Sequence, residues 1–87
     1  MEEKKYQAII EAILFTMGES VELEKLAAAL ELEKEQTREL LARMIKRYED
    51  EAFGVQIIEL DGSYQMCTKT EMYEYLIRVA KQPKRHV

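Results

Sequence analysis

The stretch that decides the fold is KEQTRELLARMIKRYED at residues 34–50, which leads through EAFG at residues 51–54 into an alternating pattern. Within it, the residues suited to a core recur at intervals of three and four, so they share one face of a helix. They are Thr37, Leu40, Leu41, Met44, Ile45 and Tyr48. The opposite face is charged with both signs interleaved, and Glu39 could pair with Arg43, or Lys46 with Asp50, one turn apart. We therefore expect an amphipathic helix over residues 34–50 that packs on a core.

Two shorter helices are predicted before this stretch. Residues 4–17 carry apolar side chains at helical spacing, and Gly18 suits the helix end because glycine readily adopts a left-handed conformation. After residues 19–21, which leave room for no more than a strand stub, a second helix is expected over about residues 22–31. Its core-facing residues are Leu23, Leu26, Ala27 and Leu30. Two residues separate it from the third helix, so the two helices must turn sharply, although Glu33 is a weak helix cap.

A β-hairpin is predicted after the third helix, because the apolar period changes from 3.6 to 2. Apolar and polar residues alternate over residues 55–57 and again over residues 64–66, and Asp61-Gly62-Ser63 between them suits a turn. Residues 58–60 break the alternation. We therefore expect a bulge there or an exposed Ile58.

The resulting fold class is α+β: three helices and a short hairpin wing, typical of a winged helix-turn-helix, with an additional C-terminal helix over residues 68–81. Thr68 with Glu71 is a possible capping box for that fourth helix, and Thr70 is an alternative cap. At 87 residues the chain is expected to form one small domain over residues 1–80. Residues 81–87, basic and broken by a proline, are expected to begin a linker to a missing second domain.

The fourth helix is apolar on two sides. Met72, Tyr75, Leu76 and Val79 form one side, and Tyr73, Ile77 and Ala80 form the other. A terminal helix that packs only on its own small core needs one apolar stripe, so the second side is predicted to meet another protein. The candidate dimer or partner surface is Ile58, Tyr73, Ile77 and Ala80.

The charge distribution makes direct binding to nucleic acid unexpected. The net charge is -4, and three of the 13 basic residues lie at positions 81–85, after all 17 acidic residues. A helix that reads the major groove presents cations near its N-terminus, whereas this one has Glu33, Glu35 and Glu39 there. Glu59 and Asp61 add acids at the wing. The alternative is a sequence-specific DNA-binding transcription regulator whose basic tail compensates for an acidic body.

The sequence offers no constellation that could support catalysis, and we expect no catalytic, cofactor-binding or metal-binding residues. His86 is the only histidine, and Cys67 has no histidine near it in sequence to activate it. Three scattered glycines form no phosphate-binding loop. A single cysteine and the absence of a signal peptide or an apolar membrane span favour a cytoplasmic protein.

The order of residues resembles one bacterial family, segregation and condensation protein B (ScpB). The pieces that carry the resemblance are EAILF at 11–15 with Gly18-Glu19, VELEKLA at 21–27 before Ala29-Leu30, Leu40-Leu41, and GSYQMCT at 62–68 running into EMYEYL at 71–76. They span nearly the whole chain in order. Departures are Ser20, where proline is common, and Glu22 and Glu33, where a small capping residue is common.

This resemblance implies the first of two tandem winged-helix domains. It implies a non-enzymatic homodimerisation module of a chromosome condensation and segregation complex, associated with the nucleoid. The family's partners are the kleisin subunit ScpA and, through it, an SMC ATPase. Because kleisin contacts in the family draw strongly on the second domain, this fragment alone is not expected to supply most of them.

Overall fold

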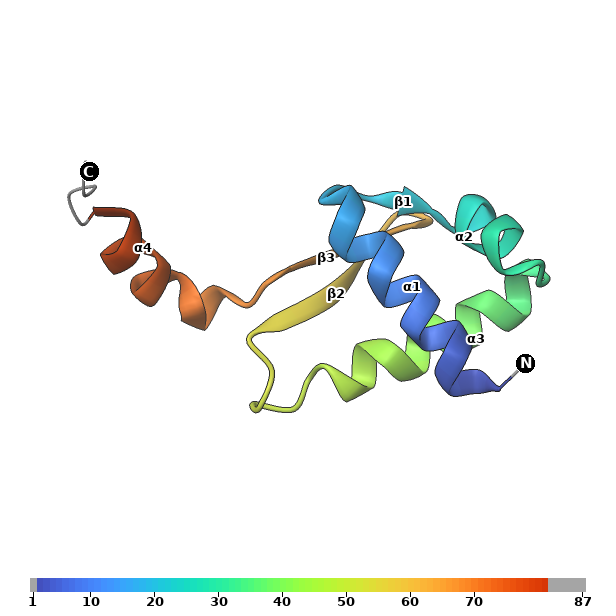
Figure 1. The fold of residues 1–87 in the computed structure, drawn as a ribbon, viewed down its shortest axis with the longest axis horizontal. Coiled ribbons are helices and arrows are strands. Elements are labelled where there is room, and N and C mark those ends of the chain that lie inside the picture. Colours follow the sequence, from blue (N-terminus) through green and yellow to red (C-terminus); the bar gives the residue numbers. More distant parts are fainter. Residues whose placement is uncertain (1, 82–87) are drawn as a thin grey trace, which may run out of the picture.

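The computed structural model describes residues 2–81, in which three helices pack on a small antiparallel sheet and a fourth helix projects from it (Figure 1). The elements are α1 (Glu3–Met17), β1 (Val21–Glu22), α2 (Leu23–Leu30), α3 (Lys34–Arg47), β2 (Val55–Leu60), β3 (Ser63–Thr68), a 3₁₀ turn η1 (Thr70–Met72) and α4 (Tyr73–Lys81). This order confirms the predicted α+β winged-helix arrangement. The predicted linker over residues 81–87 lies, apart from Lys81, outside the described residues.

The first two helices begin and end close to where the sequence predicts, and the third begins there. Gly18 closes α1 in the left-handed region, with φ of 67°, and its N–H donates to Leu14 O. Although glutamate is a weak cap residue, the backbone N–H and carbonyl of Glu33 at the start of α3 both form hydrogen bonds. Its backbone N–H donates to Gln36 Oε1 at 3.2 Å, and its carbonyl accepts from Thr37 Oγ1 at 3.0 Å. Gln36 therefore pairs an N–H that the helix leaves without a partner, and the Thr37 hydroxyl adds a second donor to a carbonyl that already accepts the Thr37 N–H.

The third helix ends earlier than expected, at Arg47 instead of Asp50. Asp50 starts a turn: its side chain accepts from Ala52 N–H at 2.8 Å, and its carbonyl accepts from Phe53 N–H at 3.0 Å. Short acidic side chains commonly form such turns because they offer the backbone an alternative to helical bonding.

The sheet has strand order β1-β3-β2, so the expected stub at β1 is a true third strand, paired through Val21 with Tyr64. The predicted bulge at residues 58–60 is wrong. Strands β2 and β3 pair one-to-one from Val55 with Thr68 to Leu60 with Ser63. The turn contains only Asp61 and Gly62, with φ of 50° and 87°. Two successive positive φ values match the twist of the hairpin, so no extra residue is needed to close it.

The core lies between the three helices and the inner face of the sheet. All of the predicted α2 residues are buried, and of the predicted α3 residues only Ile45 stays partly exposed. The fully buried large side chains are Ile10, Leu14, Leu26, Leu41, Met44 and Thr37. Ile57 and Tyr64 close the core from the sheet side. Met17, whose spacing also predicted burial, is instead 51% exposed at the end of α1.

The start of the C-terminal segment differs from the prediction. Thr68 is the last residue of β3, so it does not cap a helix; η1 begins at Thr70, with Lys69 before it. Lys69 is buried and ties the connection after β3 to the loop between α3 and β2. Its N–H donates to Gly54 O and its Nζ donates to Asp50 O, both at 2.9 Å. A backbone held at this point directs the chain away from the core.

Helix α4 consequently lies outside the domain, and the molecule measures 48 × 28 × 26 Å (Figure 1). Every residue from 73 to 80 is exposed. The expectation that Tyr75, Leu76 and Val79 would pack on the chain's own core is therefore wrong. Neither apolar side of the helix is buried in the described structure.

The core assignment makes a stability prediction. Leu41→Ala removes a fully buried side chain, so it should lower the free energy of unfolding by about 2–5 kcal/mol. Ile13→Ala, at a partly buried position on α1, should lower it by less, about 1–2 kcal/mol. Urea unfolding of the two variants and the wild type measures both effects. Equal losses would show that burial is misassigned.

Candidate protein interface

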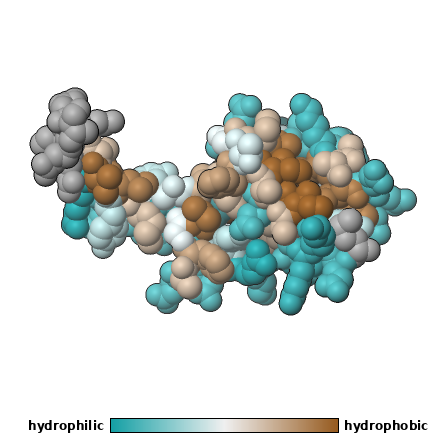
Figure 2. Space-filling view, viewed as in Figure 1, coloured by the Kyte–Doolittle hydropathy of each residue, from teal (hydrophilic) through white to brown (hydrophobic). Residues whose placement is uncertain are grey.

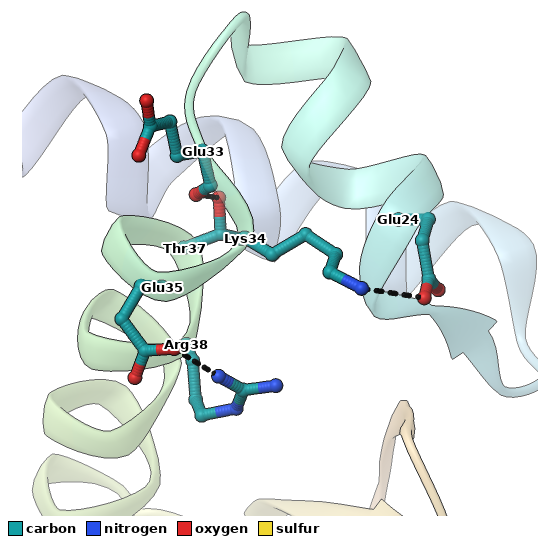
Figure 3. A network of polar contacts seen from close by, with 6 residues as sticks. All are labelled: Glu24, Glu33, Lys34, Glu35, Thr37 and Arg38. Carbon is teal, nitrogen blue, oxygen red and sulfur yellow. Dashed lines mark hydrogen bonds and ion pairs between the residues drawn. The ribbon is translucent and has the colours of Figure 1, made fainter.

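The N-terminal half of α3 presents cations that are already matched by acids (Figure 3). Lys34 Nζ lies 3.3 Å from Glu24 Oε2 on α2, and Arg38 pairs with Glu35 one turn before it. The pKa of Glu24 is lowered by a backbone hydrogen bond and then by its bond from Lys34. Such exposed pairs add little stability, but they leave no unbroken positive ridge at the end of α3 that would face a DNA groove.

The C-terminal half of α3 directs its polar side chains toward α1. Three contacts, to residues one turn apart on α1, link that helix to the end of α3 and to Tyr48 just after it. Arg43 Nε donates to Glu3 Oε2 at 2.7 Å, Arg47 Nη1 donates to Gln7 Oε1 at 2.9 Å, and Tyr48 OH donates to Glu11 Oε2 at 2.6 Å. The expected partner of Arg43 was Glu39, but the structure gives it Glu3, whose hydrogen bond raises the pKa of Arg43.

Helix α4 carries more of the exposed large apolar side chains than any other described element. Its exposed fractions are 49% for Tyr73, 54% for Tyr75, 48% for Leu76, 51% for Ile77 and 72% for Val79. The polar side is narrow: Arg78 Nη2 lies 3.1 Å from Glu74 Oε2, and its guanidinium lies 5.0 Å from the Tyr75 ring centroid. Apolar side chains cover most of the remaining circumference. A helix with so broad an apolar face is usually packed against another surface.

The structure separates the predicted surface residues onto two elements. Tyr73, Ile77 and Ala80 lie along one side of α4 and are exposed. Ile58 lies on β2, opposite Gln65, and is partly buried. It therefore belongs to the sheet face turned away from the core.

Large apolar residues outside α4 are also exposed, among them two near the end of α1. Phe15 is 76% exposed and Met17 is 51% exposed. In the sequence, Phe15 lies outside the apolar face of α1, and this position could have predicted that it is exposed. Figure 2 shows apolar atoms gathered over α1 and over α4 on the same face of the molecule.

The chemistry available within residues 2–81 is sparse. No three His, Cys, Asp or Glu side chains in that range come together as a metal site. Cys67 lies on β3, partly buried, opposite Gln56. None of the described helices has the length and apolar character needed to cross a bilayer.

Comparison with known proteins decides the family. A family model described as the segregation and condensation complex subunit ScpB matches residues 8–87. The chain belongs to the ScpB family. That family is a non-catalytic subunit of the SMC complex, as the resemblance implied.

Curated relatives agree in sequence. The segregation and condensation protein B of Agathobacter rectalis is 61% identical over 83 residues, which are 94% of this chain and 44% of that protein. The protein of the same name from Lachnoclostridium phytofermentans is 52% identical over 87 residues, 100% of this chain and 46% of that protein. The chain thus spans less than half the length of these ScpB relatives.

Solved structures agree in fold. A crystal structure described as a dimer of the ScpB N-terminal domain complexed with a ScpA peptide superposes with a TM-score of 0.83 at 31% identity, covering 87% of this chain and 95% of that chain. ScpB from Mycobacterium tuberculosis superposes with a TM-score of 0.86 at 18% identity, covering 99% of this chain and 56% of that chain. The second likeness shows the fold alone.

The contact between Tyr48 and Glu11 makes a pH prediction. Burial raises the pKa of Tyr48 above its ordinary value of 10.0, and the hydrogen bond to Glu11 raises it further. The fold therefore favours the protonated phenol, so its contribution to stability is complete below about pH 10 and is lost as the pH rises through the folded-state pKa.

Tyr48→Phe should lower the free energy of unfolding at pH 7 by about 1–2 kcal/mol and flatten the fall in stability above pH 10. Urea unfolding at pH 7 and near pH 11 measures both changes. Glu11→Gln, which keeps an acceptor but removes its charge, should give a smaller effect of the same sign. An unchanged slope above pH 10 for Tyr48→Phe would contradict the assignment.

Proposed function

We propose that this chain is a non-enzymatic homodimerisation and interaction module of a bacterial SMC–kleisin complex for chromosome condensation and segregation. The observation that carries the proposal is α4, whose apolar sides find no cover within the described chain. Burying apolar surface is the main favourable term in protein association, and a nine-residue helix gains little stability alone. A second copy that packs on α4 both buries its apolar surface and stabilises the helix.

We place the self-association surface on Tyr73, Ile77 and Ala80 of α4, with Ile58 of β2 as a further contact. The first three lie on one side of the helix and are exposed. Large exposed aromatic and aliphatic side chains are the usual anchors of protein interfaces. The similar ScpB N-terminal domain of known structure is described as a dimer, which supports the proposal.

The kleisin subunit ScpA is the second proposed partner. The same solved structure is described as a complex with a ScpA peptide, and it contains only an N-terminal domain. We infer that this fragment contacts a kleisin segment itself. Most of the kleisin contact, and through it the link to SMC, remains a proposal for the second half of the full-length protein.

Direct reading of DNA is not part of the proposal. The cations at the start of α3 are paired with Glu24 and Glu35, and Glu59 and Asp61 are exposed at the wing. Carboxylates at both contact points would repel phosphate.

The proposed function is tested by measuring the molar mass by light scattering across a dilution series, beside a DNA gel shift at low salt. We expect a dimer that dissociates on dilution and no retarded DNA band. A monomer at every concentration that binds DNA in a salt-sensitive way would instead support a DNA-binding regulator.

A substitution on α4 locates the surface. Ile77→Glu or Tyr73→Glu should raise the dimer dissociation constant by about tenfold or more, because each buries a charge against an apolar partner, while helical content stays nearly unchanged. Arg78→Gln lowers the net charge by the same amount on the polar side of α4 and should leave the dimer intact. If Ile77→Glu remains dimeric, the contact lies elsewhere, with Ile58 the next position to test.

A further inference from the structure

The end of α1 carries a shallow apolar hollow of about 320 Å³, lined by Ala12, Ile13, Thr16 and Met17. Ala12 and Thr16 are small and exposed, so they form its floor, whereas Ile13 and Met17 are larger and rise beside them. The hollow lies away from the side of α1 that Glu3, Gln7 and Glu11 use to contact α3. It is therefore an uncommitted surface of an otherwise packed helix.

Helix α4 and η1 together supply a matching ridge. Met72, Tyr75, Leu76 and Val79 stand at offsets of 0, 3, 4 and 7, the spacing with which an amphipathic helix fills an apolar groove. Tyr75, Leu76 and Val79 are each about half exposed or more. This ridge is distinct from the side formed by Tyr73, Ile77 and Ala80.

We propose that the α1 hollow of one copy receives the α4 ridge of a second copy, and that the exchange is reciprocal. This inference rests on the proposed homodimer and adds the receiving site, which the dimer proposal leaves open. In its own chain α4 extends away from the domain, so its ridge does not cover the hollow (Figure 1). Apolar residues gather over both α1 and α4 on one face of the molecule (Figure 2).

The size of a stable interface favours a second copy as the occupant. A helix of nine residues is only about 14 Å long. Two such helices packed on each other alone fall well short of the roughly 1,200 Å² that stable interfaces bury. If each copy donates one α4 and receives one, the α1–α4 contact is made twice around a two-fold axis. Its buried area then adds to that of the contact between the two sides formed by Tyr73, Ile77 and Ala80.

A cross-linking experiment between two differently labelled copies tests the exchange. Both copies carry Cys67→Ala; one also carries Val79→Cys, and the other carries Thr16→Cys and a size tag. They are mixed by dilution and reconcentration and treated with a bifunctional maleimide that spans about one helix diameter, roughly 10 Å. As a control, Lys4→Cys at the opposite end of α1 replaces Thr16→Cys.

We expect the mixed cross-linked species to form at least ~10 times more efficiently with Thr16→Cys than with Lys4→Cys, because only the former lies in the receiving site. Equal yields, or cross-links only between two Val79→Cys copies, in a sample that light scattering shows to be dimeric would overturn the exchange and leave the homodimer standing. A sample that is monomeric throughout would overturn both.

A second variant tests the hollow without any reagent. Thr16→Arg places a long charged side chain on its floor and should raise the dimer dissociation constant about tenfold or more, with the circular dichroism spectrum unchanged. If Thr16→Arg dimerises like the wild type but loses binding to ScpA, the occupant is the kleisin and the proposed exchange is wrong.

Discussion

The packing of α3 against α1 and the inner face of the sheet is the interaction on which the rest of the structure depends. Leu41 and Met44 of α3 are completely buried against a core that also contains Ile10 and Leu14 of α1. The same contact is edged by the three polar links from Glu3, Gln7 and Glu11 to α3. Helix α4 takes no part in this core, since every residue from 73 to 80 is exposed.

This packing also accounts for the electrostatic character of the domain. In many winged-helix proteins the third helix offers its cations to DNA, but here Arg43 and Arg47 are turned to α1. Lys34 and Arg38, at the other end of the helix, are matched by acids. Four of the five basic residues of α3 therefore bind side chains of the domain itself, in keeping with its membership of a family of complex subunits.

The regular helices and the hairpin could be predicted from the sequence because each depends on a local period. Features that depend on non-local or subtle effects lay beyond such a prediction. The pattern predicts a bulge over residues 58–60 or an exposed Ile58, whereas Ile58 is partly buried and the positive φ of both Asp61 and Gly62 lets the strands pair without a bulge. Arg43 finds Glu3, forty residues away, and no local spacing rule gives that pair.

The fourth helix shows the limit of the sequence argument for the interface. Spacing predicts two apolar sides on α4, one of them facing the chain's own core. The connection through Lys69, which is tied to Gly54 and Asp50, instead carries the whole helix outward. Apolar spacing shows that a surface must be covered, but the position of the helix determines whether the same chain can cover it.

The ordering of α4 by a second copy is the central claim, and amide hydrogen exchange of residues 73–81 as a function of protein concentration tests it most directly. A short helix without packing opens readily, whereas one buried in an interface opens only when the dimer dissociates. We predict that protection of these amides rises steeply with concentration, while that of α3, around Leu41, changes little. Equally fast exchange of α4 at every concentration, in a sample shown to be dimeric, would contradict the account.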